Sequence, residues 1–318
     1  MGLPGTGARP EKPAMTSEAQ TSGSALMVRP RAFGFHAEAA ASNAFARDVE
    51  NDDVASQALA EFDTLSTALD AAGVEVLVLD GDGPDAVFPN NIVSFHADGT
   101  MVLYPMATAA RRLERNGDGL KALLAASGFE VGATVDLSFH ERHVHFLEGT
   151  GSLVLDRPGR RAFASRSPRT DAQVIADFDD RLDYSTLLFE ANDRSGRPIY
   201  HTNVLLSLGT RFALLCPEAV PPDFRDVLLG EIEASGRTII AVDYAQLRNF
   251  ACNILELRGR DGPVIALSSA ALDSYRPDQR RQLEGFATLV PAAIPTIEAV
   301  GGGSVRCMIA DIHLPRMR

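Results

Sequence analysis

The chain has 318 residues, a formal net charge of −12 and a hydrophobic content of 45%. The excess of acidic residues argues against a nucleic acid or an anionic membrane as partner, because phosphates attract Lys and Arg. The same charge is compatible with a small cationic or zwitterionic substrate, and the hydrophobic content is that of a globular protein with a large core.

The three cysteines, Cys216, Cys252 and Cys307, show no short-range pairing pattern. An odd number of thiols is typical of a reduced, cytoplasmic protein rather than of a disulfide framework. The sequence contains no C-x-x-C or H-E-x-x-H motif, and no apolar run reaches the length of a membrane helix. We therefore expect neither a bound metal nor a membrane-spanning segment.

The start of the chain is rich in Gly, Pro, Ser and Thr and lacks an apolar core. We expect a disordered extension over residues 1–24, without a secretory signal, and a single catalytic domain over residues 25–318. Order is expected to begin with the short apolar strand 26–30. The small residues and scattered aromatics of 32–48 are typical of a loop or flap that enters a short helix.

From residue 54 onwards, one order of elements recurs five times. In the first unit, apolar residues fall at helical spacing within 57–72, and strands are expected at 74–80, 92–95 and 100–105. The later units begin with helices expected at 119–128, 170–182, 224–236 and 278–289. The last unit continues with a strand expected at 292–300 and lacks its third strand, which strand 26–30 could supply to close a ring.

In each unit a loop ends at a junction residue just before an apolar strand. By subtraction, the five junctions are separated by 61, 51, 50 and 54 residues. They are Asn91, Ser152, Asn203, Asn253 and Cys307. Regular periods of this size indicate a repeat architecture. We therefore predict an α/β fold with helices outside, buried strands inside and five junctions that converge on a central axis.

Four motifs carry a resemblance to a known family: PDAVFPNN, FLEGTGSLVLDR, YHTN and GGGSVRCM. In this order they resemble the pentein superfamily of guanidino-modifying enzymes, over roughly residues 25–318, and most closely its citrulline-utilisation hydrolase branch (CtlX). The resemblance implies a five-bladed, pseudo-symmetric α/β-propeller with its active site on the central axis. It also implies a cofactor-free enzyme that acts on a small guanidino or ureido amino acid.

Cys307 is the predicted nucleophile. It follows the glycines 301–303, which permit backbone conformations that side chains forbid, and it adjoins Arg306. The thiolate is the reactive form of cysteine, and a nearby positive charge or histidine favours it. Cys216 fits a small packed hydrophobe in the strand FALLCP, and Cys252 has no glycines before it, so both are interpreted as core residues.

His201 is the predicted proton-transfer residue. It lies two residues before the junction Asn203, and an unperturbed histidine pKa of about 6.5 suits proton transfer at neutral pH. It would give a proton to the leaving nitrogen and then activate the water that clears the covalent intermediate. The resemblance supports this role, because penteins carry their catalytic histidine in an H-x-[DN] motif.

The predicted acids are Asp85 and Glu148, which both fall in axial loops. Either could simply be a turn residue, next to Pro84 and Gly149 respectively. Carboxylates in such loops could also bracket a planar group with several N–H donors. The resemblance implies that Asp85 holds the terminal nitrogens of the substrate and that Glu148 orients the histidine or the substrate.

Asn203 departs from the arginine deiminase pattern, which has H-x-D at this place. An asparagine is neutral and offers both a donor and an acceptor, which suits a ureido group better than a guanidinium cation. A role in a turn is the alternative. Asn90 and Asn91 add similar neutral donors, and we include all three among the predicted substrate-binding residues.

Two further groups of residues were considered. His140, His143 and His145 lack an aspartate or cysteine at metal-site spacing, so we interpret them as a solvated or hydrogen-bonded edge. A substrate carboxylate would favour an arginine. Nothing in the sequence chooses among the axial-loop candidates Arg142, Arg157, Arg248 and Arg306. Arg306 is included among the predicted substrate-binding residues because it adjoins Cys307.

The sequence therefore predicts a cysteine-dependent hydrolase of non-peptide C–N bonds, with citrulline converted to ornithine, CO2 and NH3 through a thiocarbamoyl intermediate. Arginine deimination and dimethylarginine hydrolysis are alternatives, and amidinotransfer is a further one. A non-catalytic binding protein of pentein shape is the alternative from another class, although such proteins lack the cysteine–histidine pair. The oligomeric state stays open, and a homodimer is compatible with the sequence.

Overall fold

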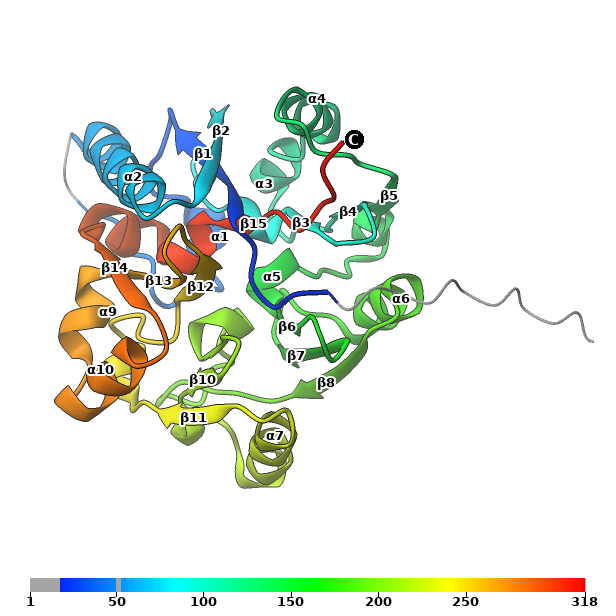
Figure 1. Cartoon of the computed structure of the whole chain (residues 1–318). Coiled ribbons are helices and arrows are strands. Elements are labelled where there is room, and N and C mark those ends of the chain that lie inside the picture. Colours follow the sequence, from blue (N-terminus) through cyan, green and yellow to red (C-terminus); the bar gives the residue numbers. More distant parts are fainter. Residues whose placement is uncertain (1–17, 50–52, 318) are drawn as a thin grey trace, which may run out of the picture.

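The computed structural model describes residues 18–49 and 53–317. Within them, five three-stranded sheets form a ring, and helices lie around its outer rim (Figure 1). Every sheet has the same topology, in which the middle strand runs antiparallel to the inner strand and parallel to the outer one. The predicted five-bladed α/β fold is confirmed.

The strands, written from inner to outer in each sheet, are β15 (Ala310–Asp311), β1 (Ser24–Pro30) and β2 (Glu75–Gly81); β3 (Val93–Phe95), β4 (Thr100–Leu103) and β5 (Ala133–Asp136); β6 (Leu153–Asp156), β7 (Arg161–Ser165) and β8 (Ser185–Phe189); β9 (Leu206–Leu208), β10 (Phe212–Leu215) and β11 (Thr238–Ala241); and β12 (Leu255–Arg258), β13 (Pro263–Ser268) and β14 (Thr288–Ala292).

The α-helices are α1 (Ala37–Ala40), α2 (Val54–Ala71), α3 (Ala109–Leu113), α4 (Gly117–Ala126), α5 (Gly149–Ser152), α6 (Ala172–Leu182), α7 (Pro222–Ala234), α8 (Tyr244–Leu247), α9 (Ser269–Ser274) and α10 (Pro277–Glu284). Short 3-10 helices are Pro89–Asn91, Ser138–His143, Thr202–Val204, Pro217–Ala219 and Val305–Met308, and Ile297–Gly301 is a π-helix.

The ring is closed by the two ends of the domain. Strand β1 pairs with β15, where Leu26 lies opposite Ala310, and on its other side with β2, where Leu26 lies opposite Leu77. The prediction that strand 26–30 completes the last unit is thus confirmed. Closure leaves the axis lined by inner strands from all five units, which brings distant loops together.

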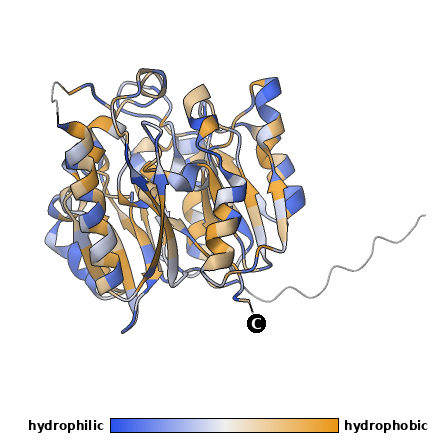
Figure 2. Ribbon diagram, turned by 90° about the horizontal axis from the view of Figure 1, so that it is seen from above, coloured by the Kyte–Doolittle hydropathy of each residue, from blue (hydrophilic) through white to orange (hydrophobic). Residues whose placement is uncertain are grey.

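The helices pack through apolar faces, as α6 illustrates. Asp171 caps its first turn by accepting a hydrogen bond from the amide of Gln173, and Asp183 ends it in the left-handed conformation with φ of 59°. Val174, Phe178 and neighbouring apolar residues of α6 are buried, each contributing about 1.5–3 kcal/mol through burial. Figure 2 shows the same pattern around the ring, with hydrophobic strands inside and hydrophilic outer helix faces.

In the last unit the predicted elements are wrong in position. Helix α10 ends at Glu284, the strand β14 spans Thr288–Ala292, and the predicted strand 292–300 instead leads into the π-helix Ile297–Gly301. Composition does not separate the two stretches, since the observed strand itself contains Pro291, which an outer edge strand tolerates; pairing with β13 places the strand at Thr288–Ala292. The unit keeps its order of elements, shifted towards the N-terminus.

The predicted disordered extension 1–24 ends too late. Residues 1–17 lie outside the described residues, but residues 18–24 are packed against the domain. Glu18 is buried and accepts a hydrogen bond of 2.5 Å from Arg157, while Gln20 donates to the carbonyl of Leu155 at 3.0 Å. In the described ranges, every helix is too short or too polar to cross a lipid bilayer.

The junction residues meet at the axis, as predicted. Asn253 Nδ2 donates to the carbonyl of Asn203 at 3.1 Å, and Thr150 Oγ1 donates to the carbonyl of Asn90 at 3.3 Å. Both contacts join segments that lie 50 or more residues apart in the sequence. The loops that carry the predicted site residues therefore form one cluster.

Candidate active site

Cys307 lies in the 3-10 helix Val305–Met308 at one end of the axis and is 2% exposed. The glycine-rich loop before it is needed for close approach. Gly302 has a φ of 63°, and a Cβ on Gly301 would lie 2.7 Å from the ring of Phe88. The glycines thus let the loop turn sharply against its neighbours and present the sulfur from a fixed backbone.

Two junction asparagines hold the sulfur. Asn203 Nδ2 lies 3.4 Å from Cys307 Sγ, and Asn253 Nδ2 lies 3.3 Å from it. Both amides act as donors, so they stabilise negative charge on the sulfur. Asn203 therefore contacts the sulfur of the predicted nucleophile, a contact that the sequence did not predict.

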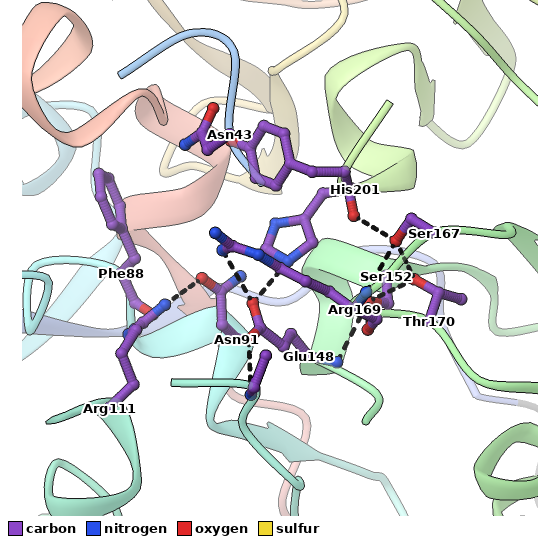
Figure 3. A network of polar contacts seen from close by, with 12 residues as sticks. Asn43, Phe88, Asn91, Arg111, Glu148, Ser152, Ser167, Arg169, Thr170 and His201 are labelled. Carbon is purple, nitrogen blue, oxygen red and sulfur yellow. Dashed lines mark hydrogen bonds and ion pairs between the residues drawn. The ribbon is translucent and has the colours of Figure 1, made fainter. Parts of the chain in front are cut away.

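His201 is fixed by a buried carboxylate. Its Nε2 lies 2.8 Å from Glu148 Oε2, and Arg169 Nη1 reaches the same oxygen at 3.2 Å (Figure 3). The other oxygen of Glu148 accepts from the amide of Ala107 at 3.1 Å. Glu148 is 0% exposed, so the carboxylate acts at low dielectric and sets the orientation of the imidazole. Gly151 leaves space for that ring, because a Cβ there would lie 2.8 Å from His201 Nδ1.

The protonation of this pair follows from burial and charge. Burial lowers the pKa of His201 to about 4, despite the hydrogen bond to Glu148, so the imidazole is neutral at pH 7. Burial alone would raise the pKa of Glu148, but the charge of Arg169 and the hydrogen bond with His201 hold that pKa well below its usual range. A neutral imidazole next to an ionised carboxylate can accept a proton at Nδ1.

Asp85 forms a hydrogen bond with His36. Its Oδ2 lies 2.6 Å from His36 Nδ1, and this hydrogen bond raises the pKa of His36. His36 belongs to the segment 32–48, which was predicted to be a loop or flap entering a short helix and does contain α1. Ala39 in the same segment accepts a hydrogen bond of 2.6 Å from Arg169. The segment therefore covers the site and contacts a predicted acid and a buried arginine.

Asn90 and Asn91 lie side by side in the neighbouring loop. Asn91 Nδ2 donates to Asn90 Oδ1 at 2.9 Å, and Asn91 Oδ1 accepts from Arg111 Nη1 at 2.6 Å. Arg111 is 2% exposed and also donates to the carbonyl of Phe88 at 2.9 Å. Figure 3 shows Arg111 reaching Asn91 from the side opposite His201.

These side chains surround one small cavity. Its lining residues are Ala39, Asn43, Asp85, Phe88, Asn91, Arg111, Arg169, Tyr200, His201, Gly301, Gly303 and Cys307. Cys307, His201 and Asp85 thus line the same cavity, as expected if the junction loops converge on the central axis. Glu148 and Asn203 are not among the lining residues. Glu148 is hydrogen-bonded to His201, and Asn203 is hydrogen-bonded to the sulfur of Cys307.

The structure separates Arg306 from the cavity. Its guanidinium donates to the carbonyl of Ile309 at 2.7 Å and lies 3.3 Å from Asp311 Oδ1. Arg157 is bound to Glu18 and Asp311 on the same side of the axis. Arg306 thus does not contact the space beside the sulfur, although it is adjacent to Cys307 in sequence.

Arg111 and Arg169 are the cavity arginines that sequence reasoning missed. Both are almost fully buried, at 2% and 3% exposure. Neither belongs to a junction motif, since Arg111 lies in α3 and Arg169 follows strand β7. No pattern in the sequence separates them from the chain's other arginines, and their role emerges only from the contacts with Asn91 and Glu148.

The histidine triplet forms ordinary polar contacts. His140 pairs with Asp177 at 3.0 Å, and His145 pairs with Asp171 at 2.9 Å, while His143 is exposed. Across residues 18–49 and 53–317, no group of three or more His, Cys, Asp or Glu side chains is placed to hold a metal ion.

We expect the protein to lose stability as the pH falls from 7 to 4.5. Burial lowers the pKa values of His201 and His96, so both take up protons on unfolding, and their stabilisation is complete above about 6.5 and lost towards lower pH. Each proton taken up costs about 1.4 kcal/mol per pH unit. The raised pKa of His36 has the opposite sign, so its stabilisation is complete below about pH 6.5, is lost as the pH rises above that value, and does not offset the loss at lower pH.

The measurement is the denaturant midpoint as a function of pH. His201→Gln should flatten the decrease below pH 6.5, whereas the same change at the exposed His143 should leave the slope unchanged. A His201→Gln profile parallel to that of the unmodified protein would contradict a neutral, buried His201.

The ring of five blades, with a thiol and an imidazole in one axial cavity, defines a protein of the pentein superfamily. Residues 29–314 match the family model described as N,N dimethylarginine dimethylhydrolase, eukaryotic. Because the match extends over most of the chain, this protein belongs to that family, which makes it a hydrolase of the pentein type. No curated protein sequence matches the chain at a significant level.

Solved structures agree with the fold. The chain is similar to apo ArgZ, an arginine dihydrolase from the ornithine–ammonia cycle in Cyanobacteria, with a TM-score of 0.72, 19% identity and 92% of this chain covered. It spans only 41% of the length of that protein, but 99% of an isolated N-terminal ArgZ domain that carries a covalent reaction intermediate (TM-score 0.69, 19% identity, 93% of this chain). A dimethylarginine dimethylaminohydrolase adduct with S-methyl-L-thiocitrulline matches at a TM-score of 0.63 and 14% identity, with 92% and 100% coverage.

Proposed function

We propose that this protein is a cysteine-dependent hydrolase of the ureido or guanidino carbon of an arginine-like amino acid, with citrulline as its best substrate. The products would be ornithine, CO2 and NH3, as in the citrulline-utilisation branch that the sequence motifs resemble. The proposed catalytic residues are Cys307, His201 and Glu148, and Asp85, Asn91, Arg111 and Arg169 are the proposed substrate-binding residues. Their common position at one cavity supports this assignment.

The chemistry follows from the protonation states. Neutral His201 takes the proton of the Cys307 thiol, and the thiolate forms a bond to the ureido carbon. His201 passes that proton to the δ-nitrogen as the C–N bond breaks, which releases ornithine and leaves a thiocarbamoyl group on sulfur. A water then gives a proton to His201 and attacks the same carbon, the C–S bond breaks, and the released carbamate decomposes to CO2 and NH3.

Glu148 fixes the tautomer and the orientation of the His201 imidazole and takes no part in bond making or breaking. Its carboxylate accepts the hydrogen bond from Nε2, so Nδ1 is the nitrogen that exchanges protons. The imidazolium formed during the reaction is stabilised by the same carboxylate, 2.8 Å away. The amides of Asn203 and Asn253 stabilise the thiolate before attack and after release.

The observation that carries the choice of a neutral substrate is the pairing of charges around the cavity. Asp85 is paired with His36, and Glu148 with Arg169, so both carboxylates already face a positive or hydrogen-bonding partner. A guanidinium cation would compete with those partners, whereas a neutral ureido group would not. Arg111 also lines the cavity, and although it is paired with Glu114 at 2.9 Å, its guanidinium suits the substrate's carboxylate better than a cationic head group.

A release assay tests this proposal. Purified protein is given citrulline, arginine, dimethylarginine and agmatine in turn, and ammonia, ornithine and methylamines are quantified. We expect citrulline to have the highest kcat/KM and agmatine, which lacks the carboxylate, the lowest. Arginine turning over at least as well as citrulline would refute the neutral-substrate assignment, and no turnover of any compound would refute the hydrolase.

Asn203→Asp should shift the preference towards arginine. The new carboxylate would lie within about 4 Å of Cys307 Sγ, outside the cavity lining, where it repels the thiolate and adds a negative charge that favours a cationic guanidinium over a neutral ureido group. We expect the ratio of kcat/KM for arginine to that for citrulline to rise about tenfold, with a lower rate on both. Asn249→Asp, at an exposed position, is the matched control, and an unchanged ratio in Asn203→Asp would contradict the charge argument.

Hydrolysis of a methylated arginine is the second candidate, favoured by the match to the dimethylarginine dimethylhydrolase family over residues 29–314. In that reaction the same thiolate attacks the guanidino carbon, and a methylamine leaves while citrulline is formed. The release assay separates the two, because methylamine and citrulline would appear from dimethylarginine in place of ornithine.

A further inference from the structure

A groove lies directly behind the loop that carries Asp85. It has a volume of about 490 Å³ and lies between the sheet of β1 and β2 and the helices α3 and α4. Side chains alternate between the two faces of β1, so Ala25 and Met27 pack with α2, whereas Leu26 and Val28 line the groove. Leu113 of α3 also lines it and is 88% exposed, so the groove presents apolar surface to solvent.

The groove and the candidate active site share a wall. In the loop 84–92, Asp85 and Asn91 line the active-site cavity, whereas Pro84 and Pro89 line the groove. The same short segment thus contributes residues to both spaces. A ligand in the groove would therefore contact the same loop that positions the proposed substrate-binding residues Asp85 and Asn91.

One ion pair crosses this wall. Arg111 lines the active-site cavity and donates from Nη1 to Asn91, while its Nε donates to Glu114 Oε2 at 2.9 Å, and Glu114 lines the groove. The other oxygen of Glu114, Oε1, has no hydrogen-bond partner in the described part of the chain, although the side chain is only 6% exposed. Gly83 lies directly against that oxygen, since a Cβ there would lie only 2.4 Å from it.

A buried carboxylate oxygen without a hydrogen-bond donor is unfavourable. A ligand with an N–H group would supply the missing donor to Glu114 Oε1. Asp80 and Asp82 also line the groove, and Arg31 is the cation paired with both, at 3.2 and 3.8 Å. Asp80, Asp82 and Glu114 thus face two guanidinium groups, those of Arg31 and Arg111, which leaves an excess of one negative charge at the groove. An apolar lining with a negative polar end is complementary to an amphiphilic cation.

We propose that this groove is a second, regulatory binding site for a small apolar amine, whose ammonium group donates to Glu114 and whose occupancy alters substrate binding through Arg111. The apolar body of the ligand lies against the face of β1 and β2. Its ammonium group competes with Arg111 for Glu114, and this competition changes the hydrogen bond that Arg111 donates to Asn91. By linkage, the amine and the substrate change each other's affinity by the same factor.

Calorimetry on the full chain with n-hexylammonium as the probe tests the site, with hexan-1-ol and hexanoate as comparison ligands. We expect hexylammonium to bind at least about tenfold more tightly than hexan-1-ol, because a charge-assisted hydrogen bond is added, and hexanoate not to bind. Glu114→Gln should remove that advantage. Equal binding of the alcohol and the ammonium, which is what an ordered water on Glu114 Oε1 would produce, overturns the proposal.

Two variants locate the site. Val28→Trp fills the groove and should abolish hexylammonium binding, whereas Val227→Trp, at a 52% exposed position on α7, should not. If Val28→Trp fails to fold, Leu113→Arg at the exposed rim places a cation there and should weaken the probe about fivefold without affecting hexan-1-ol. Binding that survives in the groove variant refutes the location.

Coupling is measured by repeating the titration with whichever of citrulline and arginine the protein binds. We expect the dissociation constant of hexylammonium to change about fivefold when the amino acid is present. An unchanged constant overturns the regulatory role. If neither amino acid binds, the function proposed above fails, while binding of the probe to the groove is still decided by the preceding measurements.

Discussion

Replacing Cys307 with serine should abolish turnover of every substrate in the release assay, with a loss of at least about 10³-fold in kcat. Serine keeps the size of the side chain but is a far weaker nucleophile at neutral pH, and neutral His201 is too weak a base to compensate. The buried site, 2% exposed, should still fold, since the two asparagine amides can donate to the hydroxyl. Measured activity above about 1% of the unmodified enzyme would exclude Cys307 as the nucleophile.

Alkylation provides the control for this variant. Burial raises the pKa of Cys216 to about 11 and raises that of Cys252 well above its usual value, so neither should react with iodoacetamide at pH 7.5. Peptide mapping should therefore find the label on Cys307 first, and citrulline should protect it. Equal, slow labelling of all three thiols would contradict an activated cysteine.

Glu148→Gln should damage both stability and activity. The substitution leaves Arg169 buried without its carboxylate, and breaking such a pair costs about 3–5 kcal/mol. It also removes the acceptor that fixes the tautomer of His201, which should lower kcat at least about 100-fold in the protein that remains folded. Urea unfolding and the release assay measure the two effects on the same preparation.

The matched control is Glu284→Gln, which breaks an exposed pair with Arg280 on α10. That pair should contribute less than about 0.5 kcal/mol, and its loss should leave kcat unchanged. A Glu148→Gln protein that unfolds at the same urea concentration as Glu284→Gln would show that the carboxylate does not hold Arg169 in the way the contacts indicate.

The repeat of five units made much of the fold predictable. Apolar strands follow each loop at regular spacing, and a buried strand can be recognised from its composition alone. The repeat therefore predicts that the junctions Asn91, Asn203 and Cys307 lie on one axis, and the contacts between Asn203, Asn253 and Cys307 agree. The last unit was misplaced because a short apolar run near Pro295 resembles a strand in composition.

The position of charged side chains was much less predictable. Arg306 is adjacent to Cys307 in sequence, yet successive residues of a 3-10 helix point in different directions, and its guanidinium ends at Asp311 on the other side of the axis. Arg111 and His36 enter the site from segments that carry no motif. Long, flexible side chains reach their partners across blade boundaries, so neighbours in sequence give little information about their contacts.

The number of units, the placement of helices outside and strands inside, and the convergence of a thiol, an imidazole and two carboxylates on one axis can be read from the amino-acid sequence alone. These features depend on local periodicity and on the repeat, which are properties of the chain. The folded structure was needed to find that Arg111 and Arg169 line the cavity, that His36 contacts Asp85, and that Asn203 contacts the sulfur. Such contacts arise when the ring closes, because closure brings together side chains whose separation in sequence contains no signal of their meeting.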